Sequence, residues 1–240
     1  MYFFRDTHGP VAVAFTDRRD GVSGVPFDSL NLAREGDDDA DAVAENWRIV
    51  LEDFAPRASM LADMHQVHGG DVETVEDWRS SSWGPTCDGL VTLTPGVVLA
   101  VRVADCVPLL LADANAGVIG AAHAGRLGLL SRVVPATLNR MRELGATDVT
   151  AWLGPHVCGG CYEVPAEMQE EVAAEVPESR ATTTWGTPSL DLGAGVRAQL
   201  AAEGVAVTDV SRCTRESADL YSYRRDGARA GRLAGLVVLR

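Results

Sequence analysis

The chain has 240 residues and 21 basic side chains, all of them arginine, because the sequence contains no lysine. Set against 34 aspartates and glutamates, they leave a formal net charge of −13. Without lysine, Schiff-base catalysis, a lysine general base and a P-loop lysine on a nucleotide phosphate are excluded. The negative charge also argues against a nucleic-acid partner, since such binding depends mainly on cationic contacts to phosphate.

The cysteine and hydropathy patterns are typical of a cytoplasmic protein. The five cysteines are dispersed and odd in number, and the first residues lack the basic and apolar segments of a signal peptide. We therefore expect reduced thiols in the cytoplasm. The longest apolar stretch, residues 97–111, contains Arg102, Asp105 and Pro108, so it is too short and too polar to span a bilayer. No membrane partner is expected.

In chain order, the first predicted element is a helix over about residues 41–54, and the acidic run before it complements the helix dipole. Strands are predicted at about 58–63, 71–75, 88–93, 97–104, 107–112 and 117–123. Apolar spacing then predicts helices over 129–141 and 168–176, with Pro165 in the first turn of the second. The last predicted strands lie at about 148–153, 181–185, 205–210 and 235–239. Strands outnumber helices without alternating with them, which favours an α+β layered sandwich, and we expect a single domain over residues 1–240.

Three short segments place metal-type ligands beside predicted strand ends. His68 lies in a Gln-Val-His-Gly segment, Cys106 ends an Ala-Asp-Cys segment, and His123 begins a His-Ala-Gly segment. Three protein ligands leave a tetrahedral zinc ion with an open position, which is typical of a catalytic site. The separations of 38 and 17 residues match no zinc-finger spacing, and an isolated buried histidine or cysteine is more often only packed.

A second interpretation needs no metal. Cys106 would be a catalytic nucleophile and His123 its catalytic base, as in cysteine hydrolases. The two interpretations differ on His68, which the zinc site requires and the dyad does not. The sequence pattern alone leaves both open.

Two further features are less specific. Cys158-Gly159-Gly160-Cys161 has the spacing of a metal or redox motif, but no second such pair and no thioredoxin-like context accompany it. We therefore assign it no metal or redox role. Arginines and tyrosines concentrate between residues 215 and 232. This stretch is either a solvated face or a pocket wall that binds phosphate through arginine while a tyrosine stacks on a base.

Together these segments resemble the family called multicopper polyphenol oxidase or laccase-domain proteins. The segments that carry the resemblance are GVSGVPFDSLNL (21–32), GDDDADAVAEN (36–46), QVHG (66–69), CDGLVTLTPGVVLAVRVADCVPLLLAD (87–113), GAAHAG (120–125), AWLGPHVCGGCYEV (151–164), CT (213–214) and SYRRDGARAGRLAGLVVL (222–239). They cover nearly the whole chain and keep the family's order. Members of this family are described as zinc-dependent purine nucleoside phosphorylases with adenosine deaminase activity.

The resemblance implies a fold, a metal and substrates. It implies a four-layer α/β/β/α sandwich with mixed sheets, and it implies that His68, Cys106 and His123 bind zinc, with copper as the less favoured metal. The substrates would be phosphate and a purine nucleoside, namely adenosine, inosine or methylthioadenosine. Asn31 and the segment containing Tyr223 and Arg225 match family motifs and are expected to bind substrate.

Two arginines that the family expects are absent. The His-Ala-Gly motif normally continues Trp-Arg-Gly, but here it continues Arg126-Leu127-Gly. The motif that usually ends Glu-Asn-Arg ends here in Trp47. If either missing arginine held phosphate, activity would be attenuated, because an apolar side chain cannot replace a bidentate cation. Arg48 and Arg126 are the nearest replacements in the sequence, and we expect Arg48 to bind substrate.

The leading hypothesis is therefore a zinc-dependent purine nucleoside phosphorylase with possible adenosine deaminase activity. One alternative is a cysteine hydrolase, for which peptidoglycan editing factors in the family are a precedent, using Cys106 and His123. Another is a copper-dependent polyphenol oxidase, although multicopper sites need more histidines than the five present. The last is a diverged zinc-binding interaction module with weak or no catalysis. The sequence does not predict an oligomeric state.

Overall fold

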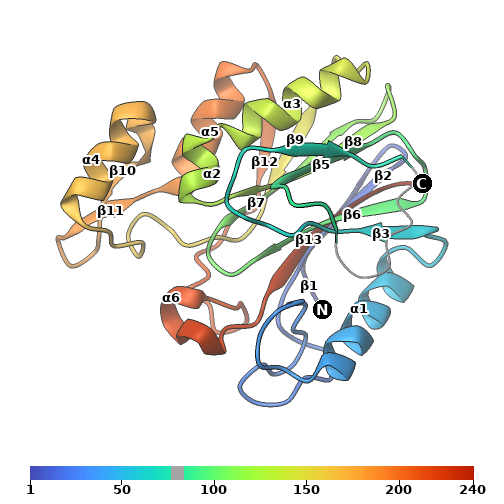
Figure 1. The fold of residues 1–240 in the computed structure, drawn as a ribbon, viewed down its shortest axis with the longest axis horizontal. Coiled ribbons are helices and arrows are strands. Elements are labelled where there is room, and N and C mark those ends of the chain that lie inside the picture. The colour runs from blue at the N-terminus through green and yellow to red at the C-terminus, as the bar shows by residue number, and fades with distance from the viewer. Residues whose placement is uncertain (77–83) are drawn as a thin grey trace.

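The computed structural model describes residues 1–76 and 84–240, which form two β-sheets stacked face to face between helices (Figure 1). The five-stranded sheet has the spatial order β1-β2-β13-β6-β3, and the six-stranded sheet has the order β12-β9-β7-β8-β5-β4. In each sheet one or two edge pairs are parallel and the rest are antiparallel. The predicted mixed sheets are thus confirmed.

The strands of the first sheet are β1 (Tyr2–His8), β2 (Val11–Thr16), β13 (Leu233–Leu239), β6 (Val97–Val103) and β3 (Met60–Ala62). Those of the second are β12 (Ala206–Asp209), β9 (Thr150–Leu153), β7 (Val107–Asp113), β8 (Val118–Ala124), β5 (Gly89–Thr92) and β4 (Val72–Thr74). A separate antiparallel hairpin consists of β10 (Arg180–Thr182) and β11 (Pro188–Leu190).

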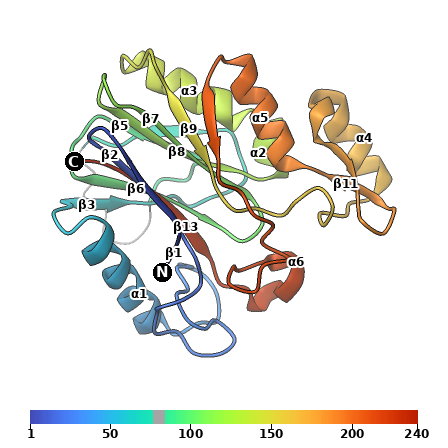
Figure 2. The same ribbon diagram turned by 180° about the vertical axis from the view of Figure 1, so that it is seen from behind.

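Helices cover the outer faces of both sheets (Figures 1 and 2). The five-stranded sheet packs against α1 (Ala40–Phe54). The six-stranded sheet packs against α2 (Arg126–Leu130), α3 (Val133–Glu143) and α5 (Leu192–Ala202). The remaining helical segments are α4 (Ala166–Glu175), α6 (Tyr223–Asp226) and the 3-10 turns η1 (Pro177–Ser179) and η2 (Gly227–Arg229). The predicted α/β/β/α sandwich is therefore confirmed.

Three apolar layers hold the sandwich together, and side-chain alternation along each central strand supplies them. On β7, Leu110 faces the layer between the two sheets, whereas Leu109 and Leu111 face the helices. On β6, Leu99 faces the same central layer and Ala100 faces α1. Because both faces of these strands are covered, their sequences are apolar except toward one end, at Arg102 of β6 and Asp113 of β7. Their ends, where the apolar runs stop, are therefore the places where polar side chains can gather.

The structure also differs from the predicted elements. The strands β1 and β2 and the helix α5 were not predicted, and the helix predicted over 129–141 is broken into α2 and α3 at Arg132, whose φ is +57°. Helix α5 contains Gly195, where a Cβ would lie 2.7 Å from Leu129 Cδ2. Close packing on α2, and not helix propensity, therefore explains a glycine in this helix. In the described residues, no helix combines the length and apolarity needed to cross a membrane.

Candidate functional site

The structure brings together the three predicted metal ligands from three different loops or strands. His68 lies in the loop between β3 and β4, Cys106 lies in the turn between β6 and β7, and His123 lies near the end of β8. Their ligand atoms all lie within 4.8 Å of one another. The Cys106 Sγ atom is 3.8 Å from His68 Nε2, and the two imidazole rings are nearly perpendicular with centroids 4.7 Å apart.

A buried carboxylate, Asp88, orients two of these ligands. One of its oxygens, Oδ1, lies 2.7 Å from His123 Nδ1 and accepts the backbone N–H of His68 at 3.0 Å. The other, Oδ2, accepts the backbone N–H groups of Val67 and Gly69 at 3.1 and 2.6 Å. This arrangement holds His68 in the left-handed region, with a φ of +61°, and leaves the Nε2 atom of His123 for the other two ligands.

Electrostatics at the site favour a thiolate ligand. Burial by itself would raise the pKa of the Cys106 thiol, but the charges and hydrogen bonds of His123 and His68 lower it to about 6. Burial opposes protonation of His123, yet the Cys106 thiolate and the Asp88 carboxylate together raise its pKa to about 9. A thiolate is both the metal-binding form and the nucleophilic form of cysteine. The geometry is therefore competent for either chemistry.

The backbone approaches the ligands closely at Gly125, which precedes helix α2. A Cβ atom at this position would lie 2.7 Å from His68 Cδ2 and 3.0 Å from Cys106 Sγ. Any other residue would push the ligands apart. The small residues after His123 are thus explained by close approach to the ligand cluster, and not by a phosphate-binding loop.

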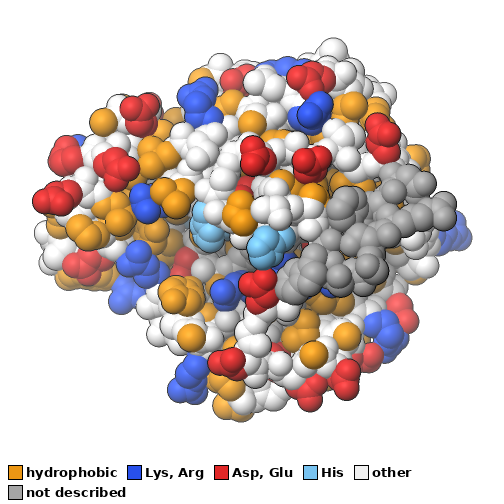
Figure 3. All heavy atoms as spheres, viewed as in Figure 1, with side chains coloured by type: hydrophobic (Ala, Val, Ile, Leu, Met, Phe, Trp, Pro, Cys, Tyr) orange, Lys and Arg blue, Asp and Glu red, His pale blue; other side chains and the backbone are white. Residues whose placement is uncertain are grey.

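A cleft of about 730 Å³ lies beside the three ligands. Figure 3 shows exposed histidine side chains near the middle of this face, surrounded by charged groups of both signs. Besides the ligands, the charged and aromatic residues of the cleft are Arg34, Glu35, His65, Arg102, Asp105, Tyr162, Tyr223, Arg224 and Arg232. Four arginines oppose two carboxylates in this set, although the whole chain carries a net charge of −13. The cleft lining therefore carries more arginines than carboxylates, in contrast to the acidic chain as a whole.

Three of the cleft arginines lie close enough to repel one another. Burial lowers the pKa of Arg102, with Asp63 opposing this shift and the positive charges of Arg34 and Arg232 adding to it. Asp63 forms ion pairs with Arg34 and Arg102. The guanidinium of Arg232 donates through Nη1 to the carbonyls of residues 230 and 231, and no bond from its Nε or Nη2 is found within the described part of the chain. An anion between these arginines would relieve their repulsion.

The C-terminal arginine and tyrosine segment forms one wall of the cleft, held by Asp105. This residue has a φ of +99°, and its carboxylate accepts the Thr214 hydroxyl and the Arg224 backbone N–H, both at 2.6 Å. The Arg224 guanidinium stacks over the Tyr162 ring with Cζ 4.3 Å from the centroid. Tyr223 lines the cleft next to it and is 54% exposed. The pocket-wall interpretation thus fits Tyr223 and Arg224.

Three predicted substrate-binding residues do not line this cleft. Arg48 lies on the outer surface of α1, where it pairs with Glu45 and Glu52. The Arg225 guanidinium donates to the carbonyls of residues 214, 217 and 220 and braces that loop. Asn31 is buried, and its Oδ1 accepts the backbone N–H groups of residues 33 and 232, both of which belong to cleft residues. Asn31 therefore positions the wall without contacting the cleft.

The positions of the two missing arginines also lie outside the cleft lining. Arg126 and Leu127 begin helix α2, and the Leu127 side chain is 45% exposed. Trp47 is buried in the layer under α1, and the Arg34 guanidinium lies 5.7 Å from its ring centroid. Trp47 thus supports an arginine of the cleft. Neither Asp88 nor Asp105 was identified from the sequence, although each lies directly beside a strand end and next to a cysteine.

Comparison with known proteins places the chain in a family. Residues 12–240 match the multi-copper polyphenol oxidoreductase laccase family. The chain belongs to this family. The resemblance found in the sequence motifs is confirmed, and solved structures of similar proteins share the fold. A Neisseria meningitidis protein, NMB0706, described as DUF152, superposes with a TM-score of 0.86 at 30% identity, covering 100% of this chain and 99% of that one.

Further proteins are similar to this laccase-family chain in fold or in sequence. YlmD from Geobacillus stearothermophilus is 30% identical with a TM-score of 0.84, over 100% of this chain and 99% of its own. A Streptomyces coelicolor protein named purine nucleoside phosphorylase is 50% identical, covering 98% of each chain. A Mycobacterium tuberculosis protein of the same name is 48% identical, over 92% of this chain and 89% of its own. These names support an enzyme.

Proposed function

We propose that this protein is a zinc-dependent purine nucleoside phosphorylase that acts on adenosine, inosine or methylthioadenosine. Phosphate would be the second substrate, and the products would be the free base and ribose 1-phosphate. The observation that carries the proposal is one cleft that combines three metal-type ligands, a surplus of arginine and two tyrosines. The names of the relatives support it.

The donor set fits zinc. Two imidazoles and one thiolate lie within 4.8 Å of one another, and Asp88 orients one imidazole in the manner of a carboxylate–histidine pair at a metal site. When bound, zinc would supply a Lewis acid with one coordination position open to substrate. Copper fits less well, because a multicopper centre needs more histidines than the three-ligand group offers. Polyphenol oxidation is therefore not proposed.

The arginines of the cleft account for the phosphate. Arg34, Arg102 and Arg232 form a cationic group whose repulsion a phosphate would relieve, and a guanidinium can hold two phosphate oxygens at once. Bound there, a phosphate oxygen would attack the anomeric carbon of the ribose, and the bond from that carbon to the base would break. Its electron pair leaves with the base, which then takes a proton. Holding both substrates in one cleft lowers the entropic cost of this displacement.

The two tyrosines of the cleft are the proposed binding surface for the purine base. Tyr162 and Tyr223 line the same cleft, and an aromatic ring offers a purine a stacking surface. Arg224 already covers one face of Tyr162, so the wall offers a purine the outer face of this guanidinium and the exposed ring of Tyr223. We infer that the purine lies against this wall, with the ribose directed toward the arginines.

A specific observation favours one other function, a cysteine hydrolase that includes the peptidoglycan editing factors. Asp88, His123 and Cys106 form a carboxylate–imidazole–thiol chain like that of cysteine hydrolases. This chain needs no third ligand, but His68 lies 3.8 Å from the Cys106 sulfur and is fixed there by Asp88. The metal site uses all of these contacts, and we prefer it for that reason.

The proposal is tested by measuring adenine release from adenosine with and without phosphate, together with zinc content. His68→Ala should lose the catalytic zinc and phosphorolysis together. A His68→Ala variant with full activity would support the cysteine hydrolase, and zinc-bound protein without turnover would support a diverged interaction module. Inosine formation in the same assay reports adenosine deamination.

A pair of arginine variants tests the phosphate site. Arg232→Met should raise KM for phosphate by about tenfold or more, because a buried charge-assisted contact is lost. Arg229→Met is the matched control, since Arg229 is exposed and does not line the cleft. Equal KM values for the two variants would contradict the phosphate assignment.

We also infer that residues 1–240 act as a single domain. We place this domain in the cytoplasm, where the five cysteines remain reduced. This inference is tested by limited proteolysis, which should yield no stable fragment, and by fractionation of cells that produce the protein.

A further inference from the structure

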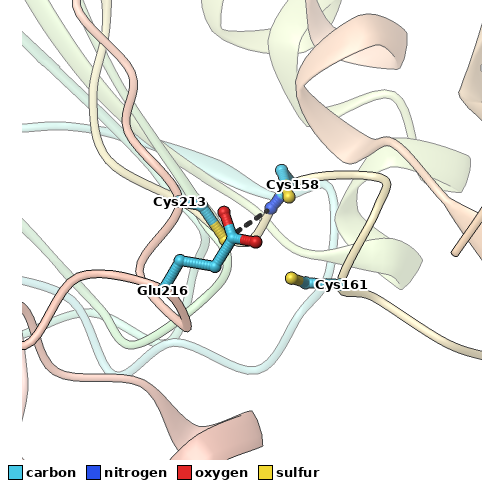
Figure 4. A group of neighbouring side chains, drawn as sticks. All are labelled: Cys158, Cys161, Cys213 and Glu216. Atoms are coloured by element: carbon cyan, nitrogen blue, oxygen red, sulfur yellow. Dashed lines mark hydrogen bonds between the residues drawn. The ribbon is translucent and has the colours of Figure 1, made fainter. Parts of the chain in front are cut away.

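We propose that Cys158, Cys161, Cys213 and Glu216 bind a second zinc ion, which has a structural role. Figure 4 shows the three cysteine side chains converging from two chain segments, with the Glu216 carboxylate directed toward them. One thiol or carboxylate atom from each of the four residues lies within 4.8 Å of the others. No residue of this group belongs to the candidate metal centre.

The four residues come from segments that are remote in sequence but adjacent in the fold. Cys158 and Cys161 belong to the turn that follows β9, and Cys213 and Glu216 belong to the loop that follows β12. The backbone N–H of Cys161 donates to the Cys158 carbonyl at 2.9 Å, which closes the turn and brings both thiols to one side. The backbone N–H of Cys158 donates to the Cys213 sulfur at 3.5 Å. An N–H group directed at a sulfur stabilises a thiolate ligand.

The turn between Cys158 and Cys161 packs tightly against the β10–β11 hairpin. The two glycines between the cysteines pack against the β10–β11 hairpin, where a Cβ at Gly159 would lie 3.0 Å from Ala181 Cβ and one at Gly160 would lie 3.2 Å from Thr184 Cγ2. The Gly159 carbonyl accepts the Ser189 hydroxyl at 2.6 Å. Gly159 thus allows the turn to sit against the hairpin with its thiols directed inward. The turn is preorganised before any metal binds.

The donor set identifies the ligand as zinc. Three thiolates and a carboxylate complete a tetrahedron and leave no open position, which is typical of structural zinc. Zinc–sulfur bonds of about 2.3 Å place tetrahedral sulfurs about 3.8 Å apart, so the observed cluster needs only a small contraction. Binding would convert three thiols to thiolates and release three protons. All five cysteines of the chain are free thiols, so the group is not occupied by a disulfide.

The group would carry a net negative charge with zinc bound. Three thiolates, one carboxylate and one zinc ion sum to a charge of −2. Arg225 donates through Nη1 to the carbonyls of residues 214, 215 and 217, so its guanidinium lies against the loop that carries Cys213 and Glu216. The same guanidinium pairs with the Asp226 carboxylate through Nε and Nη2, so Arg225 braces the loop and offsets little of the negative charge. This gives a structural reason for Arg225, which does not line the cleft.

The segments that carry the four ligands also carry residues that form or support the wall of the cleft. Tyr162 follows Cys161, and Thr214 follows Cys213 and donates to Asp105. Tyr162 and Asp105 both line the cleft. A metal joining the two segments would therefore fix one wall of the cleft at two points. Its expected role is to stabilise that wall.

Zinc counting on the full chain tests the proposal. The wild-type protein should hold two zinc ions, one for each ligand group, and His68→Ala and Cys213→Ser should each hold one. The double variant should hold none. A wild-type protein with one zinc ion that His68→Ala removes completely would overturn the proposal. Because the two groups share no residue, this result leaves the proposed phosphorylase activity untouched.

A second measurement avoids dependence on the folding of Cys213→Ser. In the zinc-loaded His68→Ala protein, Cys158, Cys161 and Cys213 should resist alkylation, and a chelator should make all three reactive and lower the melting temperature. Glu216→Gln should retain the zinc but release it at a lower chelator concentration, because the three thiolates remain. Rapid alkylation of the three cysteines before chelation would overturn the proposal. So would a Cys158–Cys161 disulfide in peptides from freshly purified protein.

Discussion

The most informative single change is Asp88→Asn, which keeps the shape of the side chain and removes its charge. The carboxylate serves four donors: the His123 ring and the backbone N–H groups of residues 67, 68 and 69. An amide has one acceptor oxygen, and its NH₂ group would face backbone donors. The variant therefore loses at least two of these contacts inside a buried site.

The expected loss can be estimated from these contacts. A buried donor left without its acceptor costs about 1–3 kcal/mol. Loss of the partner of a metal-binding histidine typically weakens metal affinity by about 10–100-fold, or about 1.4–2.7 kcal/mol. We expect Asp88→Asn to lose stability and to weaken zinc binding at His68, Cys106 and His123 within this range. Phosphorolysis should fall at limiting zinc and recover partly at high zinc.

Asp113→Asn is the matched control. The Asp113 carboxylate is also buried and also accepts four backbone N–H groups, from residues 115, 116, 147 and 148. It contacts no ligand and lies at the opposite end of β7 from Cys106, about 20 Å away at the usual rise of a strand. Asp113→Asn should therefore lose similar stability and no zinc affinity.

Zinc affinity is measured by competition with a chelator, and the zinc ion that His68→Ala loses identifies the site. Denaturant unfolding of the metal-free proteins measures their stability in parallel. Unchanged zinc affinity in Asp88→Asn would refute the reasoning. Equal weakening by Asp88→Asn and Asp113→Asn would refute it as well, because the effect would then be one of general stability.

Three further predictions follow from single contacts. Gly125→Ala should lower zinc affinity at least about tenfold, because the new Cβ would displace His68. Gly24→Ala is the control and should leave zinc affinity unchanged, because the space around its Cβ is open. A competition titration with a zinc chelator compares the two variants. Backbone N–H groups hold the pKa of Asp113 below its usual value against the effect of burial. Its contribution to stability is therefore present above the unfolded pKa of about 4 and is lost as pH falls through the lower folded pKa. Asp113→Asn should accordingly unfold with a weaker dependence on acid pH, as denaturant titrations at several pH values will reveal. Asn31→Ala should raise KM for phosphate by a few fold, because the Arg232 backbone loses an acceptor; an unchanged KM would contradict this positioning role.

The sequence by itself predicted a layered α+β sandwich and three candidate metal ligands. Apolar runs such as residues 97–101 and 107–112 identify strands covered on both faces, and Asp105 and Cys106 lie between these two runs. Strand periodicity acts between near neighbours, so it can be read locally. His68, Cys106 and His123 were recognised as metal-type ligands beside predicted strand ends, and the family resemblance implied that they bind a metal. The structure brings all three together.

Only the tertiary structure decided which other side chains reach the cleft. Asp88 gains its role because it accepts hydrogen bonds from a loop about 20 residues before it and from a histidine 35 residues after it. The packing of α1 turns Arg48 to solvent, and the Arg225 guanidinium donates its hydrogen bonds to loop carbonyls. The sequence offers no second cysteine pair near Cys158 and Cys161, whereas the structure places Cys213 beside them. Such contacts depend on how remote segments pack, which local periodicity does not encode.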